Sequence, residues 1–483
     1  MKYFTKLRLL KNSFPILLAL VIFSCTEPDE KPNILYINID DLGYKDLGFM
    51  GSSYYETPNL DRFASQSLVF TQNYAAAANC APSRACLMSG YNTPVHEIYT
   101  VSNSDRGNTR TRRIIPVPNN TTLADSVTTL AESLKQQGYV TATMGKWHLG
   151  PDPTTQGFDL NVGGSHRGSP GRNGYFSPYN LENLDNGPEG EYLTDRLTDE
   201  AIDFLEKYQD STFFLYMPYY TVHTPLMGKE ALIEHYQQKG PSGGQDHPVY
   251  GAMVTAMDQN VGRLLQKLDE LSLTQKTLVV FTSDNGGIRS ISPQDPLRAG
   301  KGSYYEGGIR VPLVIRWPGN IVPGVSSDVP VTNMDMFPTL AKITGASIKP
   351  NLDGTDISPL FSGDDIAKRD LIWHFPIYLQ AYNPKEDDGR DPLFRTRPGS
   401  VIRSGDWKLH VYYEDMGLEL YNLAEDIGET NNLAKSHPKK AAELQQALDR
   451  WIQTNEADLP TAKNPEFDSL FMQDLIEKKL AAN

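Results

Sequence analysis

The chain of 483 residues contains only three cysteines, Cys25, Cys80 and Cys86. So few cysteines exclude the disulfide framework that stabilises many small secreted domains. In an oxidising compartment a single Cys80–Cys86 disulfide is the structural alternative, but the sequence offers no further pair to support a network. We therefore interpret the cysteines as chemical groups and not as cross-links.

Positive charge is also scarce, since 45 Lys and Arg residues stand against 59 Asp and Glu residues, with a formal net charge of −14. The sequence shows no basic stripe, and so acidic a chain is a poor candidate for binding the phosphate backbone of a nucleic acid. An anionic substrate would need a local pocket of positive charge, set against the charge of the whole chain.

The apolar run near the N-terminus, residues 14–23, is too short to cross a bilayer as a helix. It follows four basic residues and no acidic ones, which is typical of a signal peptide over residues 1–24. Residues 22–25 resemble a bacterial lipobox and predict lipidation of Cys25. Phe23 is larger than usual at its position, and the alternative is an ordinary secretory signal and a soluble periplasmic protein. We expect export, with a lipid anchor as the only membrane contact, on the periplasmic or the cell-surface side.

Residues 25–32 are polar and contain prolines, which predicts a tether. From residue 33 to about 345, apolar β-branched runs alternate with amphipathic stretches, which predicts a large, mostly parallel sheet covered by helices on both faces. The expected strands are 33–39, 140–144, 213–217 and 277–282, and the expected helices are 126–137, 196–207 and 250–271.

The pattern changes beyond residue 346, which predicts a smaller C-terminal α+β subdomain over residues 346–483. Residues 400–410 and 418–423 alternate apolar and polar side chains, as in a short antiparallel sheet. Residues 439–451 are typical of an amphipathic helix that packs on this sheet.

Polar side chains follow four of the expected strands, at the edge where open α/β sheets bind their ligands. They are Asp40, Asp41, Lys146, His148, His223, Asp284 and Asn285. Two carboxylates from one strand end, with an Asp–Asn pair from another, supply the oxygen ligands that a hard cation takes. Ca²⁺ is favoured and Mg²⁺ is the second choice, whereas a two-zinc site would need more histidines and acids.

A glycine-rich stretch over residues 296–312 includes Gly300-Lys301-Gly302-Ser303. It lacks the spacing of a P-loop. Its glycines instead allow a close backbone approach to the site, with Lys301 as a point charge for an anionic oxygen.

The segment Cys80-Ala81-Pro82-Ser83-Arg84 precedes an apolar stretch that predicts a helix, which places Cys80 at a helix N-terminus. With the strand-end motifs and the Lys301 loop, it resembles the formylglycine-dependent (type I) sulfatases of the alkaline phosphatase superfamily. The resemblance covers nearly the whole mature chain in at least five separated motifs. It implies a sulfuric ester hydrolase in which Cys80 is oxidised to formylglycine by a formylglycine-generating or an anaerobic sulfatase-maturating enzyme.

The same resemblance implies a role for each matching residue. A metal ion would be bound by Asp40, Asp41, Asp284, Asn285 and the modified Cys80. Arg84 would steady the modified residue, and the sulfate would be surrounded by Lys146, His148, His223 and Lys301. A hydroxyl of the hydrated aldehyde would attack sulfur, His223 aided by Lys301 would protonate the leaving oxygen, and His148 would take the proton that releases sulfate.

The resemblance further implies a sulfated carbohydrate substrate of polysaccharide origin, such as ulvan or an algal galactan. His166, Arg167 and Arg172 lie in a glycine-rich loop and are candidate sugar contacts, with a solvated loop as the alternative. His374 is either a structural residue or a substrate contact. The alternative functions are a phosphate or phosphonate ester hydrolase of the same superfamily, and a non-catalytic glycan-binding protein if Cys80 stays a thiol.

Overall fold

Strand β1 (Asn33–Ile39) is fully buried and lies inside an eight-stranded sheet. The structure is a computed structural model that describes residues 31–171 and 173–481. The predicted signal peptide, Cys25 and all but the last two residues of the predicted tether lie outside the described residues. Residues 32–483 form one compact unit, in which the expected C-terminal subdomain contributes a second sheet.

Apolar side chains on both sides of β1 explain its place in the sheet. Leu35, Ile37 and Ile39 belong to one hydrophobic cluster, and Ile34 and Tyr36 belong to another. Because successive side chains of a strand point to opposite faces, a continuous apolar run buries both faces of the sheet.

The main sheet has the strand order β5-β4-β6-β1-β7-β8-β2-β9. The five strands from β5 to β7 are parallel to one another, while β8 runs antiparallel to β7 and to β2. In addition to β1, the sheet contains β2 (Leu68–Phe70), β4 (Val140–Met144), β5 (Leu160–Val162), β6 (Phe213–Pro218), β7 (Thr277–Ser283), β8 (Leu313–Arg316) and β9 (Val325–Ser327).

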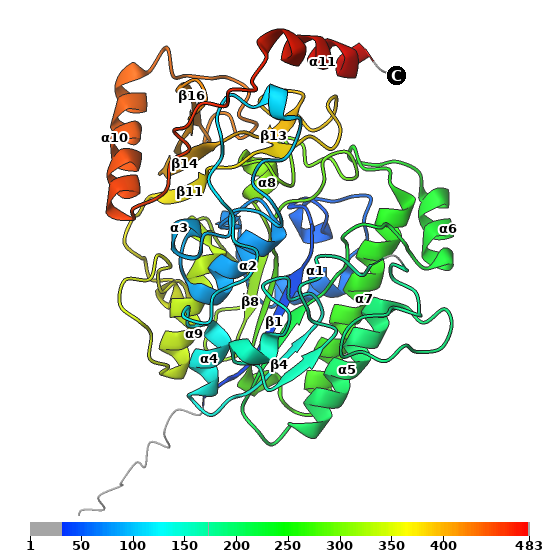
Figure 1. Cartoon of the computed structure of the whole chain (residues 1–483). Helices are drawn as coiled ribbons and strands as arrows, with labels where there is room; N and C mark the ends of the chain where they lie inside the picture. The colour runs from blue at the N-terminus through cyan, green and yellow to red at the C-terminus, as the bar shows by residue number, and fades with distance from the viewer. Residues whose placement is uncertain (1–30, 172, 482–483) are drawn as a thin grey trace, which may run out of the picture. The chain divides into compact units, whose positions relative to one another are not determined.

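Helices cover both faces of this sheet, as predicted (Figure 1). One layer consists of α1 (Pro58–Ser65), α5 (Leu193–Lys207) and α7 (Pro248–Glu270), with α6 (Glu230–Lys239) packed on α7. The other layer consists of α2 (Cys80–Ser89), α4 (Leu130–Lys135) and α9 (Met336–Thr344).

The C-terminal part contains a four-stranded antiparallel sheet, also as predicted, in the order β11-β14-β15-β16. Its elements are β11 (Leu371–Phe375), β14 (Gly399–Ser404), β15 (Trp407–Tyr412), β16 (Gly417–Asn422) and the packed helix α10 (Pro438–Thr454). Figure 1 shows this sheet and α10 beyond one end of the main sheet.

Short elements complete the described part of the chain. They are β3 (Asn73–Tyr74) paired with β10 (Val331–Thr332), β12 (Leu379–Gln380) paired with β13 (Phe394–Thr396), α3 (Thr93–His96), α8 (Glu306–Ile309), α11 (Ser469–Ala481), and the 3-10 helices η1 (Gly48–Met50), η2 (Thr109–Thr111), η3 (Pro153–Gln156), η4 (Thr274–Lys276), η5 (Asn333–Asp335) and η6 (Ser358–Phe361). Within residues 31–171 and 173–481, no helix has the length and apolar character needed to cross a membrane.

Helix α4 is shorter than the expected helix over 126–137. Thr129 forms a capping box with Glu132, in which each side chain bonds the backbone N–H of the other residue. This box fixes the start of the helix at Leu130, because the Thr129 backbone is extended.

A buried ion network joins the C-terminal sheet to the loop that carries Lys301. Lys408 Nζ lies 2.9 Å from Glu306 Oε1, at the start of α8, and 2.9 Å from Glu429 Oε1. Glu429 also accepts a hydrogen bond of 2.6 Å from the Glu306 backbone N–H. All three side chains are fully buried, so each charge depends on its partners.

We expect Lys408→Met to lower the free energy of unfolding by about 3–5 kcal/mol, because Glu306 and Glu429 lose the buried cation that they share, although Glu306 keeps Arg310. Urea denaturation measures the change. The control is Lys478→Met, which removes an exposed ion pair with Asp474 and is worth less than about 0.5 kcal/mol. Equal effects of the two substitutions would contradict this account of the network.

Candidate active site

The carboxyl ends of β1, β4, β6 and β7 bring the predicted polar residues together at one edge of the main sheet. Asp40 and Asp41 follow β1 directly, and Asp284 and Asn285 follow β7. The two strand ends are joined, because the Asp41 backbone N–H donates to Asp284 Oδ1 at 3.2 Å. The parallel register of β1 and β7 therefore sets the spacing of these carboxylates.

Each of the three buried aspartates at this edge has a buried cation as its partner. Lys146 Nζ lies 2.7 Å from Asp40 Oδ2, and Lys301 Nζ lies 2.7 Å from Asp41 Oδ2. Arg84 Nε lies 2.9 Å from Asp284 Oδ2, and its Nη1 donates to the Lys146 carbonyl oxygen at 2.7 Å. Arg84 thus holds together the loops that follow β4 and β7.

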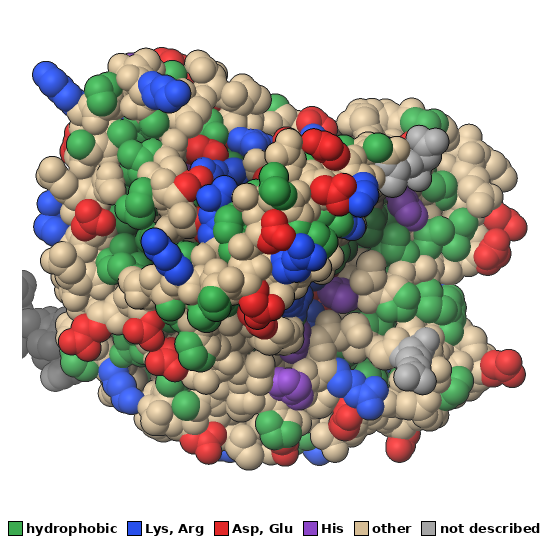
Figure 2. Space-filling view, turned by 45° about the horizontal axis from the view of Figure 1, so that its top comes forward, with side chains coloured by type: hydrophobic (Ala, Val, Ile, Leu, Met, Phe, Trp, Pro, Cys, Tyr) green, Lys and Arg blue, Asp and Glu red, His purple; other side chains and the backbone are tan. Residues whose placement is uncertain are grey.

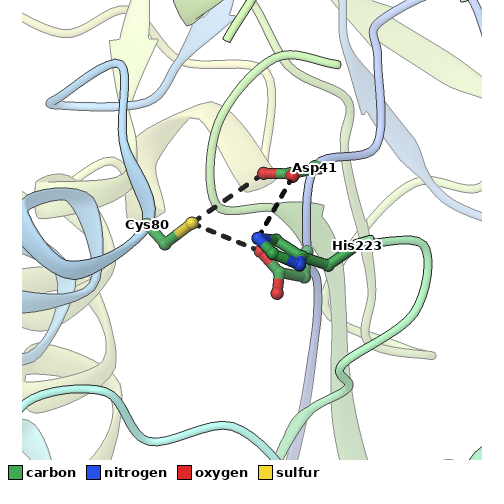
Figure 3. A group of neighbouring side chains, drawn as sticks. Asp41, Cys80 and His223 are labelled. Carbon is green, nitrogen blue, oxygen red and sulfur yellow. Dashed lines mark hydrogen bonds and ion pairs between the residues drawn. The ribbon is translucent and has the colours of Figure 1, made fainter. Parts of the chain in front are cut away.

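Cys80 is the first residue of α2, as predicted, and it is buried. Its Sγ lies 3.4 Å from Asp40 Oδ1 and 3.8 Å from Asp41 Oδ1. Figure 3 shows Cys80, Asp41 and His223 pointing toward one another from three separate segments. Both Cys80 and Cys86 are free thiols, so the alternative of a disulfide between them is wrong.

Four side chains here could share a metal ion, because ligand atoms of Asp40, Asp41, Cys80 and His223 all lie within 4.8 Å of one another. A further observation comes from Asn285, whose buried Oδ1 has no hydrogen-bond partner among the described residues. A buried amide oxygen without a partner costs free energy unless a cation or donor satisfies it. The donor set is thus mostly oxygen, which fits a hard cation.

Burial and neighbouring charges together shift the pKa values of Asp40 and Asp41 in opposite directions. Burial raises the pKa of Asp40 to about 7, although Lys146 acts in the opposite sense. Burial also tends to raise the pKa of Asp41, but Lys301, His223 and Lys146 outweigh it and lower this pKa. Burial raises the pKa of the Cys80 thiol to about 12, so an unmodified Cys80 is a poor nucleophile.

The two predicted histidines lie on different loops of the site. Nε2 of His223 is 3.7 Å from Asp41 Oδ2, and its Nδ1 is 2.6 Å from the Thr224 carbonyl oxygen. His148 is buried, and its Nδ1 has no hydrogen-bond partner in the described part of the chain. Burial lowers the pKa of both imidazoles, and nearby cations, Lys146 for His148 and Lys301 for His223, lower it further.

Backbone strain marks two residues of the site. Asp41 has φ 61° and His148 has φ 65°, in the left-handed region that residues with a Cβ rarely adopt. Such strain persists where the surrounding contacts fix the backbone, and it concentrates at functional sites.

The glycine-rich loop after β5 approaches His148, and the role of this loop as a sugar contact stays a prediction. The ring of His166 lies 6.2 Å from the ring of His148, and a Cβ at Gly168 would meet His148 Cε1 at 2.5 Å. Arg167 turns to Glu182, with Nε 3.1 Å from Oε1. Arg172 lies outside the described residues.

His374 lies on β11 and is 1% exposed. Its Nδ1 is 2.8 Å from Ser400 Oγ, and its Nε2 is 3.0 Å from the Asp458 carbonyl oxygen. Both ring nitrogens have protein partners, so neither is left for a substrate. His374 is therefore a structural residue, and the alternative of a substrate contact does not fit.

Sequence reasoning missed a second group of cations beside Lys301. Arg395, on β13, donates from Nη1 to the Lys301 carbonyl oxygen at 2.9 Å. Arg106 lies on the loop before η2, and this loop packs against β13, since a Cβ at Gly107 would lie 2.7 Å from Phe394 Cε1. No motif marks these residues, since they reach the site from segments almost 300 positions apart in the sequence. Figure 2 shows this face hollowed near its centre, with histidine, Lys and Arg side chains beside the hollow.

Comparisons with known proteins identify the family. The family model described as "Sulfatase" matches residues 32–346, and that described as "N-sulphoglucosamine sulphohydrolase, C-terminal" matches residues 300–458. The chain belongs to the sulfatase family. It is therefore a sulfuric ester hydrolase, as the relatives named sulfatase, steryl-sulfatase and arylsulfatase are.

Two curated sulfatases illustrate the likeness. A protein named "Sulfatase" from Formosa agariphila is 33% identical, and the match covers 99% of each chain. Human "Arylsulfatase A" is 32% identical, with 89% of each chain covered. Among solved structures, the protein titled Ps i-CgsB has a TM-score of 0.72 and 29% identity, over 94% of this chain and 98% of that one. A second structure of Ps i-CgsB, with a TM-score of 0.71, is a complex with k-i-k-neocarrahexaose.

Gly145 lets the backbone before Lys146 adopt φ +124° and pass against the Pro218 carbonyl oxygen, where a Cβ would clash. We expect Gly145→Ala to destabilise the sulfatase by about 2–4 kcal/mol, since backbone strain and overpacking add. Thermal and urea unfolding measure the change.

The matched control is Gly138→Ala, at φ +86° with open space around the added Cβ. Strain alone should cost about 1 kcal/mol there. If the two substitutions destabilise equally, the close approach at Gly145 does not constrain the site.

Proposed function

We propose that this sulfatase hydrolyses sulfate esters of a sulfated carbohydrate, with Cys80 converted to formylglycine as its nucleophile and one divalent cation, Ca²⁺ before Mg²⁺, as its metal. The observation that carries the proposal is the position of Cys80. It begins a helix and faces Asp40 and Asp41, which are paired with two lysines.

Conversion to formylglycine would explain why a cysteine that is a poor nucleophile as a thiol occupies the centre of the site. The thiol has a raised pKa and two carboxylate neighbours, which oppose a thiolate. A hydrated aldehyde at this position supplies one hydroxyl that attacks sulfur and a second through which the sulfate is released, whereas a serine or a thiol would retain the sulfate. A formylglycine-generating or anaerobic sulfatase-maturating enzyme is the partner that this modification requires.

A divalent cation would be held by Asp40, Asp41, Asp284 and Asn285, together with the modified Cys80. When bound, a divalent cation acidifies a hydroxyl ligand and balances negative charge on the reacting group. Two observations support this assignment. The Asn285 oxygen has no partner among the described residues, and ligand atoms of Asp40, Asp41 and Cys80 lie within 4.8 Å of one another. Asp284 is tied to this group because its Oδ1 accepts the Asp41 N–H.

The remaining residues bind the sulfate and move protons. Lys146 and Lys301 supply positive charge on either side of the aspartates, and Arg84 fixes Asp284 and the Lys146 loop. A sugar alkoxide is a poor leaving group, and we assign its protonation to His223 with the aid of Lys301. His148 has a buried Nδ1 with no partner in the described ranges, and we assign to it the proton of the second hydroxyl.

A carbohydrate substrate is supported by the Ps i-CgsB complex with a neocarrahexaose, at 29% identity. His166 near His148 is a contact for its sugar ring. A polysaccharide substrate also agrees with the N-terminal sequence, from which we propose export and a lipid anchor at Cys25. A phosphonate monoester hydrolase shares the fold at a TM-score of 0.65 and 20% identity, so phosphate and phosphonate esters are the rival substrates.

The modification of Cys80 is tested by mass spectrometry on protein made in a host with a maturation enzyme. We expect the Cys80 peptide to have lost H₂S and gained one oxygen. Cys80→Ala should lower kcat on 4-nitrophenyl sulfate by about 10³-fold or more, as removal of a nucleophile does. Cys86→Ala is the matched control, since Cys86 is equally buried in the same helix and contacts His96. An unmodified, fully active Cys80 would overturn the proposal.

Metal removal tests the cation. We expect chelation to abolish turnover and lower Tm, and Ca²⁺ to restore both. Asn285→Ala should lower the affinity for the metal by at least about 10-fold, as substitutions of residues around metal sites do. Asn73→Ala is the control, because Asn73 also has a buried oxygen without a partner but lies outside the acidic cluster. Full activity in a chelated, metal-free enzyme would contradict the assignment.

A further inference from the structure

The loop over residues 104–107 is held against the C-terminal part of the chain. The Ser104 carbonyl oxygen accepts a hydrogen bond of 2.9 Å from the Tyr378 N–H, and Asp105 forms a β-bridge with Tyr378. The Arg112 guanidinium donates to the Gly107 carbonyl oxygen at 2.9 Å. These contacts fix the backbone on both sides of Arg106.

The charge of Arg106 has no acidic partner. Its Nη2 donates to Ser102 Oγ at 2.7 Å, and no ion pair involves this guanidinium among the described residues. Its neighbour Asp105 instead pairs with Arg112 at 3.5 Å. A Cβ at Gly107 would lie 2.7 Å from Phe394 Cε1, so this loop packs against β13, the strand that carries Arg395. In agreement with this packing, burial and the nearby charge of Arg395 lower the pKa of Arg106.

Arg395 joins the surroundings of Arg106 to the loop that carries Lys301. Its guanidinium carbon lies 3.4 Å from the ring centroid of Tyr382, and its Nη1 and Nε donate to the carbonyl oxygens of Lys301 and Gln380. A Cβ at Gly302 would lie 2.6 Å from Arg395 Nη1, so the glycine is required for this approach. Within the described ranges Arg395 forms no ion pair either.

Tyr382 offers an open surface beside the two arginines. It is 50% exposed, although one face of its ring lies against Arg395. Asp387 fixes the Tyr382 backbone by accepting its N–H at 2.6 Å. A rigid exposed ring next to cations is suited to a sugar ring that carries an anionic group.

We propose that Arg106, Tyr382 and Arg395 form a subsite for a second anionic group of the substrate, a carboxylate or another sulfate on the carbohydrate beside the scissile ester. Arg106 binds the anion, Tyr382 packs on the sugar, and Arg395 is a positioning residue for Tyr382 and the Lys301 loop. The subsite rests on the proposed function, because it lies beside Lys301. Neither arginine forms an ion pair within the described residues, and Asp387, the carboxylate near Arg395, accepts the backbone N–H groups of Tyr382 and Asn383. An anionic group of the ligand supplies negative charge beside the two arginines.

The test compares kcat/KM of Arg106→Ala and wild type on matched disaccharides: one with a single sulfate, one with a second sulfate, and one with a uronic carboxylate. We expect Arg106→Ala to lower kcat/KM about 10-fold or more on whichever doubly charged substrate the wild type prefers, since a charge-assisted hydrogen bond is lost. The loss on the singly sulfated disaccharide should be several-fold smaller. Whether the wild type has the higher kcat/KM on the disulfated or on the uronic disaccharide shows whether the subsite binds a sulfate or a carboxylate.

Arg106→Lys should recover part of the loss, and Tyr382→Ala should raise KM more than it lowers kcat. The control is Arg450→Ala, which removes an exposed arginine from α10. Equal losses on all substrates, or a wild-type preference for the singly charged one, would overturn the subsite.

A binding measurement keeps this test separate from the proposed function. Calorimetry with the unmodified Cys80 protein and the same disulfated and uronic disaccharides needs no turnover. Weaker binding by Arg106→Ala supports the subsite even if no sulfate ester is hydrolysed, and unchanged binding overturns it. Failure of hydrolysis by matured enzyme would count against the proposed function alone.

Discussion

Three buried carboxylates at one edge of the sheet, Asp40, Asp41 and Asp284, are the constraint on which the site depends. Placed together without partners they would repel one another at a high cost in free energy. Each is matched by one buried cation, from Lys146, Lys301 and Arg84. The cations come from three separate segments, so the charge balance also fixes how these segments are arranged.

The C-terminal sheet takes part in this balance through Lys301. Lys301 lies in a loop that leads into α8, and α8 begins at Glu306, which is paired with Lys408 of β15. Arg395 of β13 holds the backbone of Lys301 itself. The C-terminal part of the chain therefore positions Lys301 through both its four-stranded sheet and β13, and residues 32–483 form one compact unit.

Much of the fold and of the inner site could be predicted because the signals are local. The run over residues 33–39 is apolar enough to mark a buried strand, and parallel strands deliver the residues that follow them to one edge. Helix α4 was less predictable, since its start depends on the side-chain bonds of Thr129. His374 was ambiguous because its partners, Ser400 and Asp458, are distant in the sequence.

Arg106 and Arg395 could not be predicted as site residues, because the contacts that place them join segments distant in the sequence. Arg106 and Arg395 come near each other because the 104–107 loop pairs with Tyr378 and packs against Phe394. Neither lies after a strand of the main sheet, and neither belongs to a recognisable motif. Tertiary contacts between segments distant in the sequence bring the two residues near each other.

The central claim, that this pocket transfers a sulfuryl group, is tested most directly by the ratio of kcat/KM values on 4-nitrophenyl sulfate and 4-nitrophenyl phosphate. The two esters share a leaving group and differ in the charge and identity of the reacting centre. The account predicts a higher kcat/KM for the sulfate with matured enzyme. A substantially higher kcat/KM for the phosphate would contradict it.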